Sequence, residues 1–161
     1  MRYKDFEGTL EELVEQKLQE IEEKEHVRIL HAVESGSRSW GFASPDSDYD
    51  VRFIYVRRPE DYLKLEPARD VIEWELDETL DINGWDLQKA LRQYHRSNST
   101  LFEWANSPVV YRTTEEWRQI HQAASVYFSE KAAMYHYYGT AKSNFLEFLQ
   151  GDTVKYKKYF Y

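Results

Sequence analysis

Two strand-like segments on either side of one polar loop constrain the fold of this chain most strongly. Residues 27–33 form an apolar run typical of a buried strand, and residues 48–57 alternate well enough to predict a second strand. The loop between them, residues 36–46, contains glycine, serine and proline, and a turn of helix is expected at residues 38–41. The second strand starts with Asp48-Tyr49-Asp50, although the packing of a core does not require two carboxylates there. The pattern therefore indicates chemistry as well as folding.

The rest of the sequence predicts an α+β protein. Residues 9–24 predict an amphipathic helix that begins with a capping box of Thr9 and Glu12, and further strands are expected at residues 70–76 and 78–83. After Gly84 the hydrophobic period becomes helical, and the expected helices span residues 86–97, 100–105, 115–127, 129–149 and 152–161. We therefore expect a small mixed sheet with flanking helices in residues 1–85, followed by a helical region, residues 86–161, that packs on it.

The helical region contains two expected N-caps and many aromatic residues. Asp86 is placed to cap the first helix, and Thr113 is placed to cap the third, with Glu116 in the capping-box position. Because large aromatic side chains are mostly buried, we expect those of this region to lie mainly in the core. They are Trp104, Trp117, Tyr127, Phe128, Tyr135, Tyr137 and Tyr138.

The composition of the 161 residues restricts the cellular compartments and the classes of binding partner that we expect. The chain has no cysteine, which excludes disulfides and thiolate metal sites and agrees with a cytoplasmic protein. No run of about 18 apolar residues occurs, so we expect no membrane span, and residues 1–12 lack the apolar part of a signal peptide. The net charge of −8 argues against tight non-specific binding to duplex nucleic acid. A divalent cation can still screen contacts with a few phosphates.

The carboxylates of Asp48 and Asp50 have the spacing of a cation site. Side chains at positions i and i+2 of a strand point to the same face, about 6.5–7 Å apart, so the two charges repel each other unless a cation lies between them. Carboxylate oxygens suit Mg²⁺ or Mn²⁺, and two such ions can hold a phosphoryl group. In the loop, Gly36 allows close approach of a phosphate, Ser37 supplies a hydroxyl and Arg38 supplies a charge. Together these residues predict a nucleoside triphosphate site.

The order of Gly36-Ser37, a spacer and Asp48-Tyr49-Asp50 resembles the signature of the DNA polymerase beta-type nucleotidyltransferase superfamily. The chain is most similar to one branch, the RNA repair pathway DNA polymerase beta family of predicted nucleotidyltransferases. This similarity covers nearly the whole chain from about residue 27. The segments that carry this similarity are GSRSWGFASPDSDYDVRFIYV, LDINGWDLQKAL, SNSTLFEWANSPVVY, TAKSNF and GDTVKYKKYFY. Family members continue beyond a Lys-Lys-Tyr segment like residues 157–159, so the chain resembles the family with its C-terminal end missing.

The resemblance implies a third carboxylate on a later strand. Asp81, between two apolar neighbours, has the expected pattern. Asp86 is the rival, although a helix cap explains it, and Asp77 and Glu73 are weaker candidates. Asp48, Asp50 and Asp81 would then be the catalytic residues and would bind two Mg²⁺ or Mn²⁺ ions.

The resemblance also raises two questions about lysine residues near the C-terminus. In the superfamily's architecture the helix that contains TAKSNF packs across the cleft from the head, so Lys142 either reaches the triphosphate or is a solvated helix lysine. Lys155, Lys157 and Lys158 form a small basic patch with interleaved tyrosines. This patch either contacts an RNA end or is the exposed face of a helix.

The leading expectation is a metal-dependent nucleotidyltransferase that transfers a nucleoside monophosphate from a nucleoside triphosphate, with ATP favoured, to a hydroxyl acceptor. The family resemblance implies that the acceptor is an RNA or DNA 3′ end. One alternative keeps the chemistry but adenylylates a protein or a small molecule. A second alternative is a nucleotide-binding or interaction module without turnover.

Overall fold

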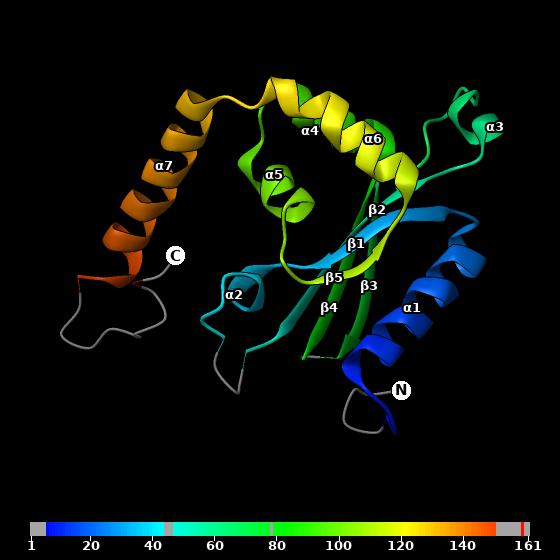
Figure 1. The fold of residues 1–161 in the computed structure, drawn as a ribbon, viewed down its shortest axis with the longest axis horizontal. Coiled ribbons are helices and arrows are strands. Elements are labelled where there is room, and N and C mark those ends of the chain that lie inside the picture. The colour runs from blue at the N-terminus through cyan, green and yellow to red at the C-terminus, as the bar shows by residue number, and fades with distance from the viewer. Residues whose placement is uncertain (1–5, 44–46, 78, 151–158, 160–161) are drawn as a thin grey trace.

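The computed structural model describes residues 6–43, 47–77, 79–150 and 159. Five strands form one mixed sheet in the order β3-β4-β2-β1-β5 (Figure 1). The β2–β4 pair is parallel and the other pairs are antiparallel. The strands are β1 (Arg28–Glu34), β2 (Tyr49–Val56), β3 (Val71–Asp77), β4 (Leu80–Asp86) and β5 (Val110–Thr113).

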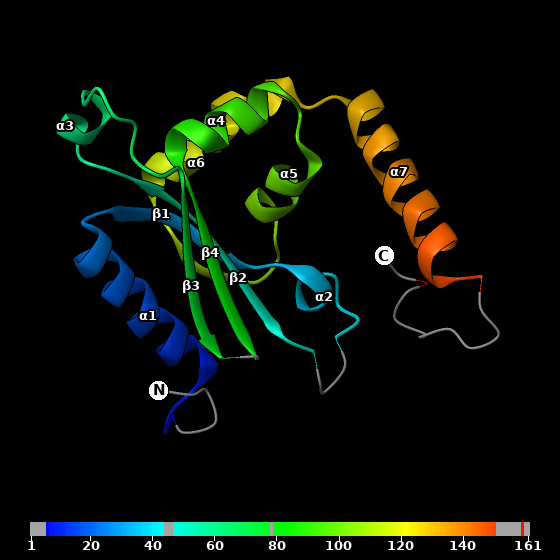
Figure 2. The same cartoon turned by 180° about the vertical axis from the view of Figure 1, so that it is seen from behind.

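Helices cover both faces of the sheet, which confirms the α+β class with helices toward the C-terminus (Figures 1 and 2). One face is covered by α1, and the other by α4, α5 and α6. The helices are α1 (Leu10–Glu25), α2 (Gly36–Ser39), α3 (Pro59–Tyr62), α4 (Leu87–His95), α5 (Ser99–Ala105), α6 (Glu115–Ala124), the short 3₁₀ helix η2 (Ser125–Tyr127) and α7 (Glu130–Phe148). None of the helices in the described part of the chain is both long and apolar enough to cross a membrane.

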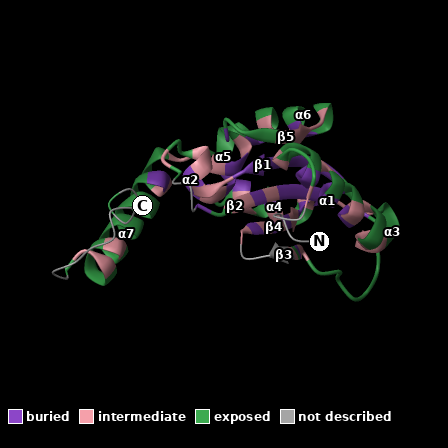
Figure 3. Cartoon of the chain, turned by 90° about the horizontal axis from the view of Figure 1, so that it is seen from below, coloured by how far each residue is buried: buried purple, intermediate pink, exposed green. Residues whose placement is uncertain are grey.

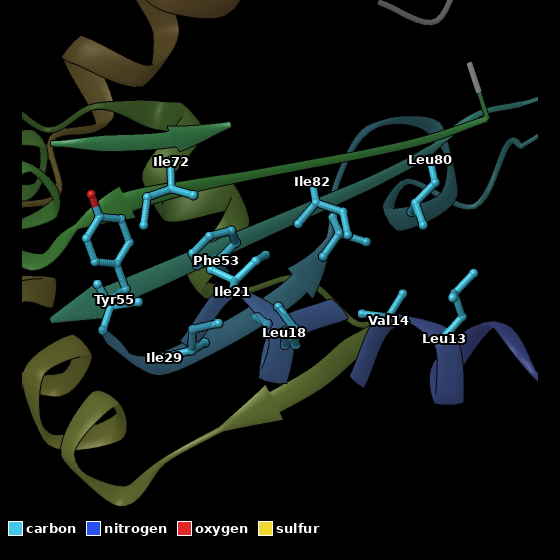
Figure 4. Close-up of a cluster of buried hydrophobic side chains, with 13 residues drawn as sticks. Leu13, Val14, Leu18, Ile21, Ile29, Phe53, Tyr55, Ile72, Leu80 and Ile82 are labelled. Atoms are coloured by element: carbon cyan, nitrogen blue, oxygen red, sulfur yellow. The ribbon is translucent and has the colours of Figure 1, made fainter. Parts of the chain in front are cut away.

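The core beneath α1 explains why the N-terminal helix and the strands form together. The capping box of Thr9 and Glu12 is present as predicted, and it starts α1 so that one apolar stripe faces the sheet. That stripe comprises Leu13, Val14, Leu18 and Ile21. Figure 4 shows these side chains against Phe53 and Tyr55 of β2 and Ile82 of β4. Odd-numbered residues of β2 therefore face α1, which leaves its even-numbered residues for the opposite face.

The second core lies between the sheet and helices α4, α5 and α6. It includes Ile54 of β2 together with Tyr94, Trp104 and Trp117. The expectation that the aromatic residues lie mostly in the core holds for these tryptophans and is wrong for α7. Along α7 only Ala133 is buried (Figure 3). The exposed aromatic side chains at residues 127–148 include Tyr127, Phe128, Tyr135, Tyr137, Tyr138 and Phe145.

Several predicted boundaries differ from the observed ones. The fourth strand runs to Asp86, three residues beyond its expected end, because β2 pairs with it along its full length. The short strand β5 was not predicted. It lies in residues 86–161, the region expected to be helical, and pairs with β1 at the edge of the sheet. The cap of α6 is Thr114, because Thr113 belongs to β5, so the predicted capping box with Glu116 is wrong. The helix expected at residues 152–161 falls almost entirely outside the described residues.

Candidate functional site

Parallel pairing of β2 and β4 brings two of the predicted carboxylates to one place. Asp50 and Asp81 are direct partners in the register of the two strands. The alternating residues Tyr49, Val51, Leu80 and Ile82 pack in or against the core beneath α1. Asp50 and Asp81 therefore point to the other face of the sheet, at the end not covered by α4.

A single arginine bridges these carboxylates. Nη2 of Arg52 donates to Asp50 Oδ1 at 3.0 Å and to Asp81 Oδ2 at 2.7 Å. Its Nη1 donates to the main-chain oxygens of Val51 at 3.1 Å and Asp81 at 3.2 Å. Within the residues that the structure describes, no three carboxylate or histidine side chains are already gathered closely enough to hold a metal ion. The two carboxylates therefore converge on a cation, and in this structure that cation is the guanidinium.

Gly36 lies against the carboxylate of Asp50. It begins α2 with a φ of 63°, in the left-handed region that favours glycine. A Cβ atom at this position would overlap Oδ2 of Asp50. The main-chain nitrogen of Ser35 donates to the carbonyl of Asp50 at 2.8 Å, which holds the loop on the strand. The predicted proximity of the glycine loop and Asp50 is therefore present, and Ser37 follows as a buried residue of α2.

Arg38 of α2 contacts the segment that contains Asp48 and leads into β2. Asp48 is exposed and immediately precedes the strand. The guanidinium of Arg38 donates to the carbonyls of Ser47 at 2.6 Å and Asp48 at 3.2 Å, and it stacks 3.7 Å from the centre of the Tyr49 ring. In this structure Arg38 therefore fixes the chain that leads into the strand, and its contact with a phosphate stays a prediction.

The structure separates the candidates for the third carboxylate. Asp86 is opposite Tyr55 in the strand register, five residues along β4 from Asp81. It is buried and accepts hydrogen bonds from the Gln88 main-chain nitrogen and the Tyr62 hydroxyl, both at 2.8 Å. Asp86 therefore serves as a helix cap, and Asp81 is the acid beside Asp50. Glu73 is exposed and pairs with Asn83, and the side chain of Asp77 lies outside the described part.

Lys142, for which the sequence left open a triphosphate contact or a solvated position, is not brought to this place. Lys142 is exposed in the second half of α7. That helix packs against α5 and is separated from β2 and β4 in Figures 1 and 2. The patch of Lys155, Lys157 and Lys158 lies outside the described residues. The site described here therefore consists of the loop before β2 and the facing ends of β2 and β4.

Glu34 is a buried acid next to the site that the sequence analysis did not single out. Its Oε1 accepts the main-chain N–H of Asp50 at 2.9 Å, and its Oε2 accepts the hydroxyl of Tyr111 at 2.6 Å. Burial raises the pKa of Glu34 above its usual range, against the opposing effect of these hydrogen bonds. Glu34 therefore holds the main chain of Asp50 in place from the face of the sheet that packs against α1. Its place at the end of an apolar run, two residues before Gly36, was the available signal.

The raised pKa of Glu34 predicts a pH-dependent contribution to stability. An acid whose pKa is higher in the folded state favours folding when protonated, and this contribution is lost as the pH rises above the usual value of 4.5 through the raised pKa. The variant Glu34→Gln is neutral at every pH, so its stability relative to the wild type should increase from pH 4.5 toward neutrality. The expected gain is about 1.4 kcal/mol for each unit by which the pKa is raised.

Urea denaturation of both proteins across this pH range measures the difference in the free energy of unfolding. Glu23→Gln, which changes an exposed acid of α1, is the matched control and should show no such trend. A stability difference between Glu34→Gln and the wild type that stays constant with pH would contradict the prediction.

A sizeable cavity lies away from these carboxylates. It has a volume of about 570 Å³ and is lined by residues around α3 and the start of α4, including Arg57, Tyr62, Asp70 and Asp86. The acids of this cavity already have internal partners, since Asp86 caps a helix and Asp70 accepts from Lys89 at 3.2 Å. Convergence of two carboxylates on one cation is the more specific chemical signal, so we place the candidate site at Asp50 and Asp81.

Comparisons with known proteins identify the family of the chain. A sequence model of the RNA repair pathway DNA polymerase beta family matches residues 10–161. The chain is also 49% identical over 148 residues to "Uncharacterized protein YcgL" of Bacillus subtilis (strain 168). That alignment covers 89% of this chain and 56% of the relative, so the chain spans about half the relative's length. The family match indicates a fold of the polymerase beta-type nucleotidyltransferase class.

Proposed function

The chain belongs to the RNA repair pathway DNA polymerase beta family, and from this membership and the geometry of its carboxylates we propose that it is a metal-dependent nucleotidyltransferase. The observation that carries the proposal is the pairing of Asp50 with Asp81 on parallel strands, where both carboxylates hold one cationic group next to Gly36. This arrangement concentrates negative charge directly beside the glycine loop.

The residues present fit divalent cations. Carboxylate oxygens are the ligands that Mg²⁺ and Mn²⁺ prefer, and Mg²⁺ is usually bound by one or two carboxylates together with the substrate's phosphates. Asp50 and Asp81 already point to one positive group, and Asp48 is exposed two residues before Asp50. These three acids would hold the ions, two in the full site. When bound, such ions lower the pKa of an acceptor hydroxyl and screen the charge of the phosphates.

The chain's own residues would orient the two reactants. The missing Cβ of Gly36 leaves room for the carboxylate of Asp50 against the loop. Ser37 and Arg38 would hold the β- and γ-phosphates. Asp81, across from Asp50, would face the acceptor hydroxyl. Attack of that hydroxyl on the α-phosphorus forms a new phosphodiester bond and breaks the bond to the β-phosphate oxygen, so a nucleoside monophosphate is transferred and pyrophosphate leaves.

For the acceptor we propose an RNA 3′ hydroxyl, in line with the family's description, and for the donor ATP. The test is incubation of the folded protein with each α-labelled nucleoside triphosphate, Mg²⁺ or Mn²⁺, and RNA oligomers that end in a 3′ hydroxyl or a 3′ phosphate. We expect label on the oligomers with a free 3′ hydroxyl and none in the presence of EDTA. Absence of label on any acceptor, with every nucleotide and both metals, would end the proposal.

The net charge of −8 supports a second candidate for the acceptor. An acidic protein attracts polyanions weakly, so a protein or a small molecule is the alternative substrate for the same chemistry. The same incubation with a cell lysate in place of RNA separates the two candidates. Label on protein and none on RNA would replace the RNA 3′ end by a protein acceptor while leaving the nucleotidyltransferase assignment in place.

A further inference from the structure

Arg52 is held in the middle of the carboxylate site by four hydrogen bonds. Two come from Nη2 and end on the carboxylates of Asp50 and Asp81. The other two come from Nη1 and end on main-chain oxygens of Val51 and Asp81, which belong to the adjacent strands β2 and β4. The Arg52 side chain is only 16% exposed, whereas the side chains of Asp50 and Asp81 are 32% and 50% exposed, so the carboxylates can be reached from solvent while the guanidinium is mostly covered.

The position of this guanidinium conflicts with the proposed metal ions. A cation that binds Asp50 and Asp81 through the oxygens that Nη2 now contacts competes with the guanidinium, and two positive charges a few ångströms apart repel each other. Resting on the nucleotidyltransferase proposal, we propose that Arg52 is the resident counter-cation of this site. It competes with divalent ions for Asp50 and Asp81, so that ions bind only when Nη2 releases the carboxylates.

The hydrogen bonds of Nη1 make such a release feasible. They end on main-chain carbonyls, whose positions are fixed by the pairing of β2 with β4 and do not depend on the carboxylates. The guanidinium can therefore give up its two ion pairs and remain attached to the strands. Without a metal ion, the arginine balances two acids that would otherwise repel each other. Arg52 thus acts as a positioning residue that stabilises the metal-free state and lowers the affinity for the ions.

The test compares Mn²⁺ binding to the nucleotide-free wild type and to Arg52→Gln, by calorimetry or by the electron paramagnetic resonance signal of free Mn²⁺. We expect Arg52→Gln to bind Mn²⁺ at least about tenfold more tightly, because a competing charge is removed. We also expect it to melt at a lower temperature than the wild type without metal, and to gain more in melting temperature when Mn²⁺ is added.

The chain offers a matched control for this comparison. Arg112 of β5 also bridges two carboxylates, those of Glu15 and Glu22 on α1, and its side chain is 20% exposed. Arg112→Gln should therefore lower the melting temperature as well, but leave the Mn²⁺ affinity unchanged. A purely structural role of Arg52 predicts the same result for both variants.

The measurement on the wild type keeps the proposal falsifiable if Arg52→Gln does not fold. In that case the side-chain ¹⁵N–H resonances of Arg52 should change as Mg²⁺ is added, with the midpoint at the dissociation constant for Mg²⁺. Unchanged resonances at saturating Mg²⁺, or an Arg52→Gln protein that binds Mn²⁺ no more tightly than the wild type, would overturn the competition. If Arg52→Gln binds Mn²⁺ more tightly but the wild type transfers nucleotide to no acceptor, the proposed enzyme would be refuted and the competition retained.

Discussion

Replacing Asp50 with asparagine is expected to lower the rate of nucleotide transfer by about 10³-fold or more, the upper range for loss of one electrostatic group in an active site. Asp50 is the residue that contacts Arg52 and borders Gly36, and it pairs in register with Asp81. Asparagine has nearly the same shape, so the loop and the strand should keep their places. The negative charge is lost, however, and an amide oxygen binds a divalent cation much more weakly than a carboxylate does.

A rate measurement with α-labelled ATP at saturating Mg²⁺ checks this result, and an unfolding curve shows whether the variant is folded. Asp70→Asn is the matched control, because Asp70 is also a partly exposed acid paired with a basic side chain, Lys89 at 3.2 Å, but at the opposite end of the sheet. The control should retain most of the activity. Loss of less than tenfold in Asp50→Asn would show that the site of transfer lies elsewhere in the chain.

Local signals in the sequence predicted most of the fold correctly. The capping box of Thr9 and Glu12 and the cap at Asp86 depend only on residues two or three positions away, and both are observed. The two strands around the glycine loop were predicted for the same reason, since their apolar pattern is local. The placement of Asp50 next to Asp81 was an expectation from a resemblance, and the parallel register of β2 and β4 brings the two acids together.

The remaining features depend on partners that are distant in the sequence. Strand β5 has only four residues, and it is a strand because β1 offers it an edge about 80 residues upstream. Arg52 reads from the sequence as one polar residue of an alternating strand, and only the pairing with β4 shows that it bridges two acids. The exposure of α7 was missed because aromatic content predicts burial only on average.

Gly36→Ala is expected to destroy the site at a modest cost in stability, and it has an unusually good control. Gly36 has a φ of 63°, so alanine costs about 1–2 kcal/mol in backbone strain. Its Cβ would also overlap Oδ2 of Asp50, which must then move away from the loop. Gly41 has a φ of 79°, but among the described residues no atom beyond its two chain neighbours lies within 4 Å of the position of a Cβ. Gly41→Ala should therefore have a similar backbone strain without displacing the carboxylate.

The two variants separate the backbone requirement of the loop from the requirement for space beside Asp50. Both should lose about 1–2 kcal/mol in the free energy of unfolding by urea denaturation. Transfer of labelled nucleotide should fall by at least about 10²-fold in Gly36→Ala, because a displacement of about 1 Å at a reacting group has an effect of that size. In Gly41→Ala it should stay within a few-fold of the wild type. Equal activity in the two variants would mean that contact between Gly36 and Asp50 has no role in catalysis, even if Asp50 itself is required.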